Sequence, residues 1–197
     1  MPRTPLQFQQ MKDERKLSIL ESALPLFAIN GKDGVSIDMI CQKAKCSHGL
    51  AYHYFKNSDQ IYSELLSSNT YKNLFSNLNL FDSSKDSYFQ LVALTNKLVE
   101  LVNESKTILA FGLIILSSED KDSLRSNVTK LISQGQKEGT ITGGTPSDIT
   151  NTLFLFFKGL FLSRLNEKHP RDKVPSVDNI IKIFKRQNSS LYFLTFA

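Results

Sequence analysis

The chain has 197 residues, of which 41% are hydrophobic, and a formal net charge of +5 at pH 7. This apolar content supports a packed core and excludes an intrinsically disordered chain. The mild positive charge permits a nucleic-acid partner without requiring one, because net charge governs association more than fold. The length suits one domain of ordinary size, or a small domain joined to a larger one.

The sequence also indicates the cellular compartment in which the protein is expected. The two cysteines, Cys41 and Cys46, are too few for a disulfide framework. The first ten residues lack the apolar segment of a secretory signal. The apolar runs at residues 111–116 and 153–157 are far shorter than the ~20 residues that span a bilayer. We therefore expect a cytoplasmic protein that does not enter a membrane.

The N-terminal part of the chain reads as three short helices. Residues 12–30 place apolar side chains on one helical face, and Gly31 is a typical residue just past a helix end. Ser36 is a suitable N-cap for a helix over residues 37–44, and Ser47 for a helix that carries "HGLAYHYF". The link of about three residues between these helices has the length of a helix-turn-helix turn.

The remaining chain is also predicted to be helical. Asn57 caps a helix that we expect to run as far as residue 81 and to join the two parts without a flexible linker. Further helices are predicted over residues 88–103, 107–116 and 121–139, from Thr145 onward with Pro146 at the first helical position, and over residues 176–197. The fold class is thus all-α, with about nine helices. A compact module of short helices over residues 1–57 is thus followed by a larger helical body over residues 58–197.

The helix that follows Ser47 divides into two faces. Ala51 and Phe55 can face inward, while Tyr52 and His53 lie near the opposite side together with His48. Exposed Tyr and His side chains suit contacts with phosphates and base edges when such a helix enters a major groove. The tyrosines could instead be half-buried with satisfied hydroxyl groups.

A metal site is a competing interpretation of the same stretch. Cys41, Cys46, His48 and His53 are ligand types, but their spacing does not match common zinc sites. The apolar setting of the two cysteines favours buried small side chains. We expect no metal and no cofactor.

Several fixed spacings agree with one family. "ILESALPLFAING" is followed by Ser36 as a cap, by "ICQKAKCS" at the turn, by "HGLAYHYF", and by "KNSDQIYSEL" at the start of a capped helix. Residues 16–66 resemble the DNA-binding domain of the TetR/AcrR family of bacterial transcriptional regulators. The resemblance implies a helix-turn-helix DNA-binding domain over residues 1–57 and a helical effector-binding and dimerisation domain over residues 58–197. It also implies a regulator that binds a palindromic operator in double-stranded DNA as a homodimer.

The resemblance also implies roles for single residues. Ser36, Tyr52 and Tyr54 match phosphate-contacting positions, and His48, Gly49 and His53 match positions close to bases. Two residues depart from the family pattern: Lys45 replaces a glycine of the turn, and Ser58 replaces a lysine, for which Lys56 is a substitute. The predicted DNA-binding residues are Ser36, Lys45, Ser47, His48, Gly49, Tyr52, His53, Tyr54 and Lys56.

The helix after Thr145 is apolar nearly all round, so it must be buried on more than one side. We predict a homodimer through Phe156, Gly159, Leu160 and the C-terminal helix; a central core helix in a monomer is the alternative. A pocket for an unknown, largely apolar small-molecule effector is also predicted, although such aromatic stripes are typical of plain core. Its predicted lining residues are Tyr62, Leu66, Tyr71, Phe75, Phe89, Phe111, Ile115, Phe154 and Phe157.

These observations favour a one-component transcriptional regulator, a repressor that an effector releases or modulates. One alternative is a redox-responsive regulator acting through Cys41 and Cys46, and another is a regulator controlled by a protein partner. An enzyme is not expected, because the chain has no Gly-rich phosphate loop and only three histidines.

Overall fold

The computed structural model describes residues 5–74, 82, 85–118, 123–165 and 173–182, and within these ranges it contains ten α-helices and no strand. The all-α fold class is therefore confirmed. The helices are α1 (Pro5–Asn30), α2 (Ile37–Ala44), α3 (His48–Tyr54), α4 (Ser58–Ser67), α5 (Asn69–Asn73), α6 (Ser87–Val102), α7 (Lys106–Ser117), α8 (Leu124–Glu138), α9 (Pro146–Leu165) and α10 (Val177–Ile181).

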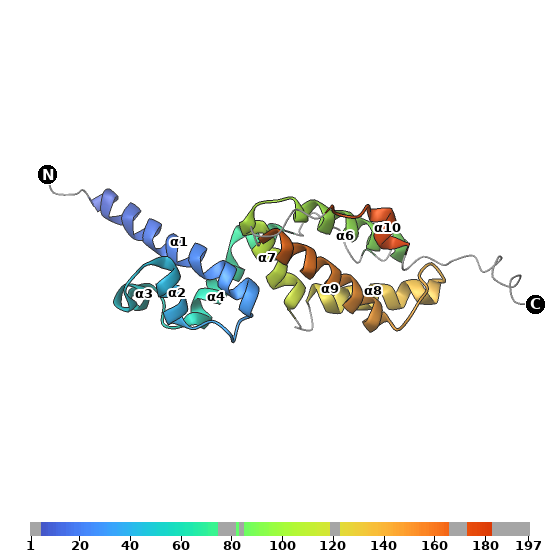
Figure 1. The fold of residues 1–197 in the computed structure, drawn as a ribbon, viewed down its shortest axis with the longest axis horizontal. Helices are drawn as coiled ribbons and strands as arrows, with labels where there is room; N and C mark the ends of the chain where they lie inside the picture. Colours follow the sequence, from blue (N-terminus) through green and yellow to red (C-terminus); the bar gives the residue numbers. More distant parts are fainter. Residues whose placement is uncertain (1–4, 75–81, 83–84, 119–122, 166–172, 183–197) are drawn as a thin grey trace, which may run out of the picture.

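Two units lie side by side along the long axis of the molecule (Figure 1). The N-terminal unit is α1–α4, and the C-terminal unit is α6–α10. Helix α1 connects them, because it packs against α7 as well as against α2 and α4. Helix α3 lies in the N-terminal unit, away from the C-terminal unit (Figure 1).

Helix α1 begins earlier than the sequence pattern predicted. It starts at Pro5, whereas residue 12 was expected. Proline is well suited to the first helical position, because its fixed φ matches the helix and its missing N–H has no helical acceptor there. The predicted end was correct, since Gly31 follows the helix with φ +74° and donates its N–H to the Phe27 carbonyl at 3.0 Å.

The prediction of one long helix from Asn57 toward residue 81 was wrong. Helix α4 ends at Ser67, and Ser68 adopts an extended conformation with φ −63° and ψ 147° before α5 begins at Asn69. Serine and asparagine side chains compete for backbone hydrogen bonds and so favour helix ends over helix interiors. No continuous α4 therefore links the two units, and residues 75–81 lie outside the described residues.

Helix α4 packs with the N-terminal unit. Lys16 Nζ of α1 lies 2.6 Å from Glu64 Oε1, and the rings of Phe27 and Tyr62 meet edge to face with centroids 5.0 Å apart. The predicted domain boundary at residues 57 and 58 lies at the start of α4, which packs against α1 and α5.

The C-terminal unit is built around α7 and α9. Residues 109–116 of α7 are all buried, and Leu91, Leu94, Leu98 and Leu101 form a buried apolar stripe on α6. Thr129 of α8 donates its hydroxyl to that of Thr150 on α9 at 3.1 Å, and Thr150 in turn donates to the Pro146 carbonyl. The predicted cap of α9 is confirmed, because the Asp148 N–H donates to Thr145 Oγ1 at 3.2 Å.

Close contact between α7 and α9 depends on Gly112. A Cβ atom at this position would collide with the Phe161 ring, which is completely buried. Gly112→Ala is expected to lower the free energy of unfolding by about 1–3 kcal/mol, because the ring has no free space to move into. Chemical denaturation monitored by circular dichroism measures this. Gly49→Ala, where a Cβ meets nothing within 4 Å, is the control and is expected to show no such loss.

Only the beginning of the predicted C-terminal helix falls within the described residues. Ser176 caps α10 by accepting the Asn179 N–H at 3.4 Å, and residues 183–197 lie outside the described ranges. In the parts of the chain that the structure describes, no helix has the length and apolar character needed to cross a membrane.

Candidate nucleic-acid interface

Helices α2 and α3 and the turn between them form the candidate interface. Each helix begins at a serine cap, as predicted: Ser36 Oγ accepts the Met39 N–H at 3.3 Å, and Ser47 Oγ accepts the Leu50 N–H at 3.2 Å. Both serines are exposed. The first backbone N–H groups of a helix have no helical acceptor, so both helix starts offer donors to a phosphate.

Lys45 closes α2 in a left-handed conformation, with φ 52° and ψ 42°. It is the one non-glycine residue with positive φ within the described residues. Its N–H donates to the Gln42 carbonyl at 3.3 Å, and the Cys46 N–H donates to the Cys41 carbonyl at 3.0 Å. The turn thus has the geometry that favours glycine, and the lysine occupies it under strain.

Lys45→Gly is expected to raise the free energy of unfolding by about 0.5–1 kcal/mol, because glycine adopts positive φ without a Cβ clash. The larger conformational entropy of glycine in the unfolded chain offsets part of this gain. Lys45→Ala is the matched control, since it removes the same charge and keeps a Cβ atom. Urea denaturation without DNA measures both variants. Equal stabilities of the two variants would contradict the strain.

The faces of α3 divide as predicted. Ala51 is completely buried, and Phe55, which follows the helix, is 1% exposed. Tyr52 is 55% exposed, which is unusual for so large a side chain within an otherwise packed unit. His48, Gly49 and His53 are exposed as well, whereas Tyr54 is half-buried with its ring edge to face with that of His53. The structure therefore brings the predicted base-facing residues onto one exposed face.

The lysines around this face differ in whether another side chain of the unit already neutralises their charge. Lys45 and Lys56 are exposed, and the Lys56 N–H donates to Gln60 Oε1 at 2.7 Å at the start of α4. Lys32 instead pairs with Asp59 at 3.3 Å, so its charge is partly neutralised within the unit. His48 Nε2 lies 3.4 Å from Asp38 Oδ1 on α2, which holds this ring at the junction of α2 and α3.

The two cysteines lie on the inner side of the turn. Cys41 is 2% exposed, and Cys46 is half-buried. Burial, followed by a hydrogen bond with Cys46, raises the pKa of the Cys41 thiol to about 11. The thiolate is the reactive form, so Cys41 is a poor nucleophile at neutral pH. Among the described residues, no group of three or more His, Cys, Asp and Glu side chains is placed to hold a metal ion.

The predicted effector-binding residues lie in several parts of the structure. Phe111, Ile115, Phe154 and Phe157 are buried in the core where α7 and α9 meet, while Phe89 is 62% exposed on α6. Tyr62 and Leu66 are half-buried on α4, against the N-terminal unit. Phe75 and the side chain of Tyr71 lie outside the described residues.

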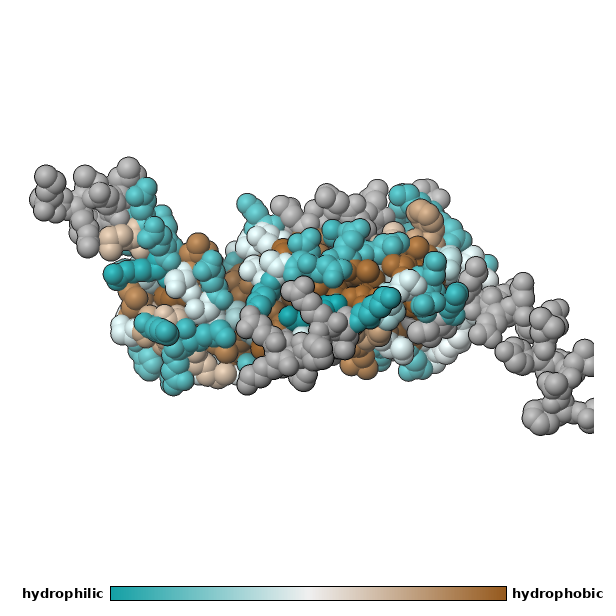
Figure 2. Space-filling model, turned by 45° about the horizontal axis from the view of Figure 1, so that its top comes forward, coloured by the Kyte–Doolittle hydropathy of each residue, from teal (hydrophilic) through white to brown (hydrophobic). Residues whose placement is uncertain are grey.

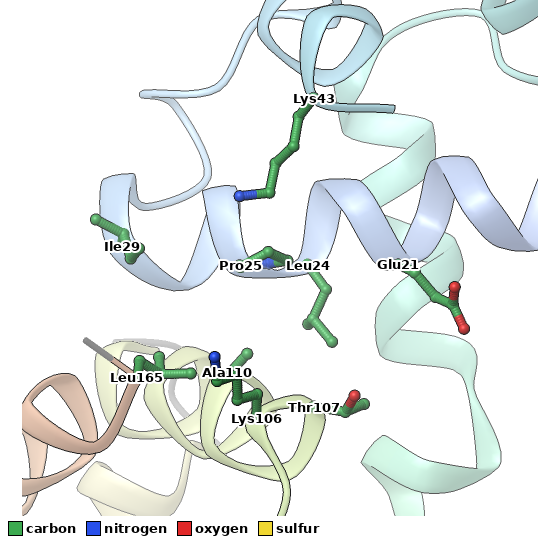
Figure 3. A pocket seen from close by; sticks show the side chains of 9 residues that line it. All are labelled: Glu21, Leu24, Pro25, Ile29, Lys43, Lys106, Thr107, Ala110 and Leu165. Carbon is green, nitrogen blue, oxygen red and sulfur yellow. The ribbon is translucent and has the colours of Figure 1, made fainter. Parts of the chain in front are cut away.

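A cavity lies at the junction of α1 and α7 (Figure 3), and none of the nine predicted residues lines it. No sequence pattern indicated it, because its walls come from α1, α2, α7 and α9, which are distant in the chain.

Comparisons with solved structures show the fold. The MbdR regulator from Azoarcus sp. CIB is similar with a TM-score of 0.51 and 22% identity, over 75% of this chain and 85% of that chain. NalD, the secondary repressor of the MexAB-OprM multidrug efflux pump in Pseudomonas aeruginosa, is similar with a TM-score of 0.54 and 17% identity, over 89% and 98%. AibR in complex with isovaleryl coenzyme A and operator DNA is similar with a TM-score of 0.55 and 17% identity, over 85% and 94%. No functionally curated protein matches the chain.

The family match falls on the unit that holds the candidate interface. Residues 19–65 match the model of bacterial regulatory proteins of the tetR family. This range runs from the middle of α1 to α4 and includes both capped helix starts, the strained turn at Lys45 and the exposed face of α3. Residues 19–65 therefore form a domain of the tetR family of bacterial regulatory proteins, the family's helix-turn-helix DNA-binding domain.

Proposed function

We propose that the protein is a one-component transcriptional repressor that binds a palindromic operator as a homodimer and is released by a small-molecule effector. The observation that carries this proposal is the exposed face of α3. Tyr52 is 55% exposed, beside His48 and His53, on a helix whose other face is anchored by Ala51 and Phe55. A solvated aromatic and histidine face on a short, rigidly packed helix suits insertion into a major groove.

Phosphate contacts would fix the register of α3 on the duplex. We assign these contacts to the first backbone N–H groups of α2 and α3, which follow Ser36 and Ser47, to the side chains of Lys45 and Lys56, and to the hydroxyl of Tyr54. Such contacts position a protein on DNA without reading sequence, whereas His48 and His53 would contact base edges. We assign Tyr52 to base edges as well, because it shares their exposed face, although the family resemblance matches it to a phosphate-contacting position. The DNA-binding domain would extend over residues 1–57, as expected from the sequence, with α4 packed against it.

A homodimer would supply a second copy of α3, which would contact the second half of the palindromic operator. One face of α9 stays uncovered in the single chain: Leu155 is 65% and Leu162 42% exposed, with the half-buried Phe156 and the exposed Gly159 between them. Figure 2 shows apolar surface exposed on the C-terminal unit, bordered by hydrophilic side chains. An apolar helix face of this kind is typical of a subunit interface, and two-fold symmetry matches a palindromic operator.

Selection from random double-stranded DNA by the full-length protein tests the proposal. The expected result is one enriched sequence with two inverted half-sites, bound more tightly than unselected DNA at fixed salt concentration. Failure to enrich any sequence, at salt concentrations where non-specific binding is weak, would contradict sequence-specific binding.

A further inference from the structure

The first turns of α1 project from the N-terminal unit. The helix begins at Pro5, and among its described side chains Ile19 is the first that is buried. At about 1.5 Å per residue, the helix therefore runs for about 20 Å before it reaches the core. Figure 1 shows these turns projecting past α2, α3 and α4, at the end of the molecule away from the C-terminal unit. Isolated helices of fewer than about 12–15 residues are marginal in water, so this segment gains stability when a partner covers it.

The projecting segment carries basic side chains on one side. Lys12, Arg15 and Lys16 are spaced three or four residues apart, so they lie on the same face of the helix. Continued by four residues from Arg15, this face carries Ile19, which is 1% exposed in the core. The side of α1 that packs into the N-terminal unit thus becomes basic where the helix leaves that unit.

The charges of Lys12 and Arg15 are not neutralised by the described part of the chain. Both side chains are exposed, and within the described residues neither has an ion-pair partner. The two acidic residues between them, Asp13 and Glu14, lie on other sides of the helix, because each residue turns the chain by about 100°. One side of this segment is therefore basic, although its two basic and two acidic residues sum to zero.

Contacts of Lys16 show which way the basic side faces. Its Nζ atom lies 2.6 Å from Glu64 Oε1 and 5.7 Å from the centroid of the Phe55 ring. Phe55 directly follows α3, and the exposed Lys56 comes next. The basic side thus faces the C-terminal end of α3, and Lys12 lies about 6 Å nearer the N-terminus on that same side.

We propose that Lys12 and Arg15 bind phosphates of the DNA backbone, in a contact separate from those of α2 and α3; this step rests on the proposed function. A duplex that receives α3 in its major groove lies on the side toward which these two residues point. Basic side chains on an exposed helix face bind phosphates without reading sequence. The contact would therefore raise affinity for every duplex, and bound DNA would cover the segment of α1 that projects from the unit.

The salt dependence of binding tests this contact in the full-length protein. Lys12→Gln with Arg15→Gln removes two charges from each subunit, and glutamine is a good helix former. Each phosphate contact contributes about 0.9 to the slope of log affinity against log salt concentration, so the slope for a dimer should fall by about 2–4. Affinity for a selected operator at about 0.1 M salt should fall by at least about tenfold. Fluorescence anisotropy over a series of salt concentrations measures both quantities.

Lys130→Gln with Lys137→Gln is the matched control. It removes the same number of charges from exposed positions on α8 of the C-terminal unit and should leave slope and affinity unchanged. An equal loss in both double variants would be a general effect of net charge and would overturn the contact. An unchanged slope in the α1 variant would overturn it as well.

A charge-conserving variant separates phosphate binding from a structural effect. Lys12→Arg with Arg15→Lys keeps both charges and should retain the wild-type slope, whereas a slope as low as that of the glutamine variant would overturn the assignment to phosphates.

Unselected duplex DNA separates this contact from sequence recognition. The glutamine variant should weaken binding to the selected operator and to unselected DNA by the same factor, because phosphates are common to both. A loss confined to the operator would overturn the assignment to phosphates. Failure to select an operator would contradict the proposed function, while the salt dependence on unselected DNA still decides whether α1 binds phosphates.

Discussion

Replacing Tyr52 and His53 together by alanine is expected to lower operator affinity by about 10³-fold, to near the level of non-specific binding. Each base-edge contact contributes roughly 1–3 kcal/mol of discrimination, and a dimer loses every contact twice. Tyr52 is 55% exposed and His53 is exposed as well, so the variant should keep its fold. Fluorescence anisotropy with a selected operator and with an unrelated duplex, at one salt concentration, measures both affinities.

Phe89→Ala is the matched control for this loss. Phe89 is an aromatic residue of similar exposure, at 62%, but it lies on α6 of the C-terminal unit. Its removal should leave operator affinity within a factor of about two, because surface substitutions away from a site change little. If the Tyr52 and His53 variant retained full operator affinity with an unchanged melting temperature, α3 would not be the reading helix.

Much of the N-terminal unit could be predicted because its determinants are local. Caps at Ser36, Ser47 and Asn57 require only an oxygen that reaches an N–H three residues on, and all three hydrogen bonds are present. The two faces of α3 follow from helical periodicity in the same way. The left-handed turn at Lys45 was indicated by the family pattern, in which a glycine stands there.

Features that depend on long-range packing could not be predicted. The break at Ser68 divides a stretch in which helical periodicity alone gave no clear end. Pro25 lies inside α1, where it cannot donate a hydrogen bond to the Glu21 carbonyl, and both residues line the cavity at the unit junction. That cavity exists only because α1 packs against α7, and no local pattern indicates this contact.

Charge on the uncovered face of α9 is expected to abolish the proposed homodimer. Leu155→Glu with Leu162→Glu places two carboxylates on each subunit at positions that are 65% and 42% exposed in the single chain. Burying unpaired charges in an interface is costly, so the dimer dissociation constant should rise by at least about 100-fold. Sedimentation equilibrium measures it. Phe89→Glu, an equally exposed apolar residue on α6, is the control and should leave the dimer intact.

Gly159→Ala is a separate test. The direction of its effect on dimer stability differs between a position where α9 crosses a partner helix and a free surface. Glycine inside a helix costs about 1 kcal/mol relative to alanine, and a Cβ atom at Gly159 meets nothing within 4 Å in the single chain. Gly159→Ala should therefore stabilise a monomer. At a close helix crossing between subunits the added methyl group instead clashes with the partner, so the dimer should weaken while the isolated subunit becomes more stable. A dimer unaffected by this substitution would place the crossing elsewhere on α9.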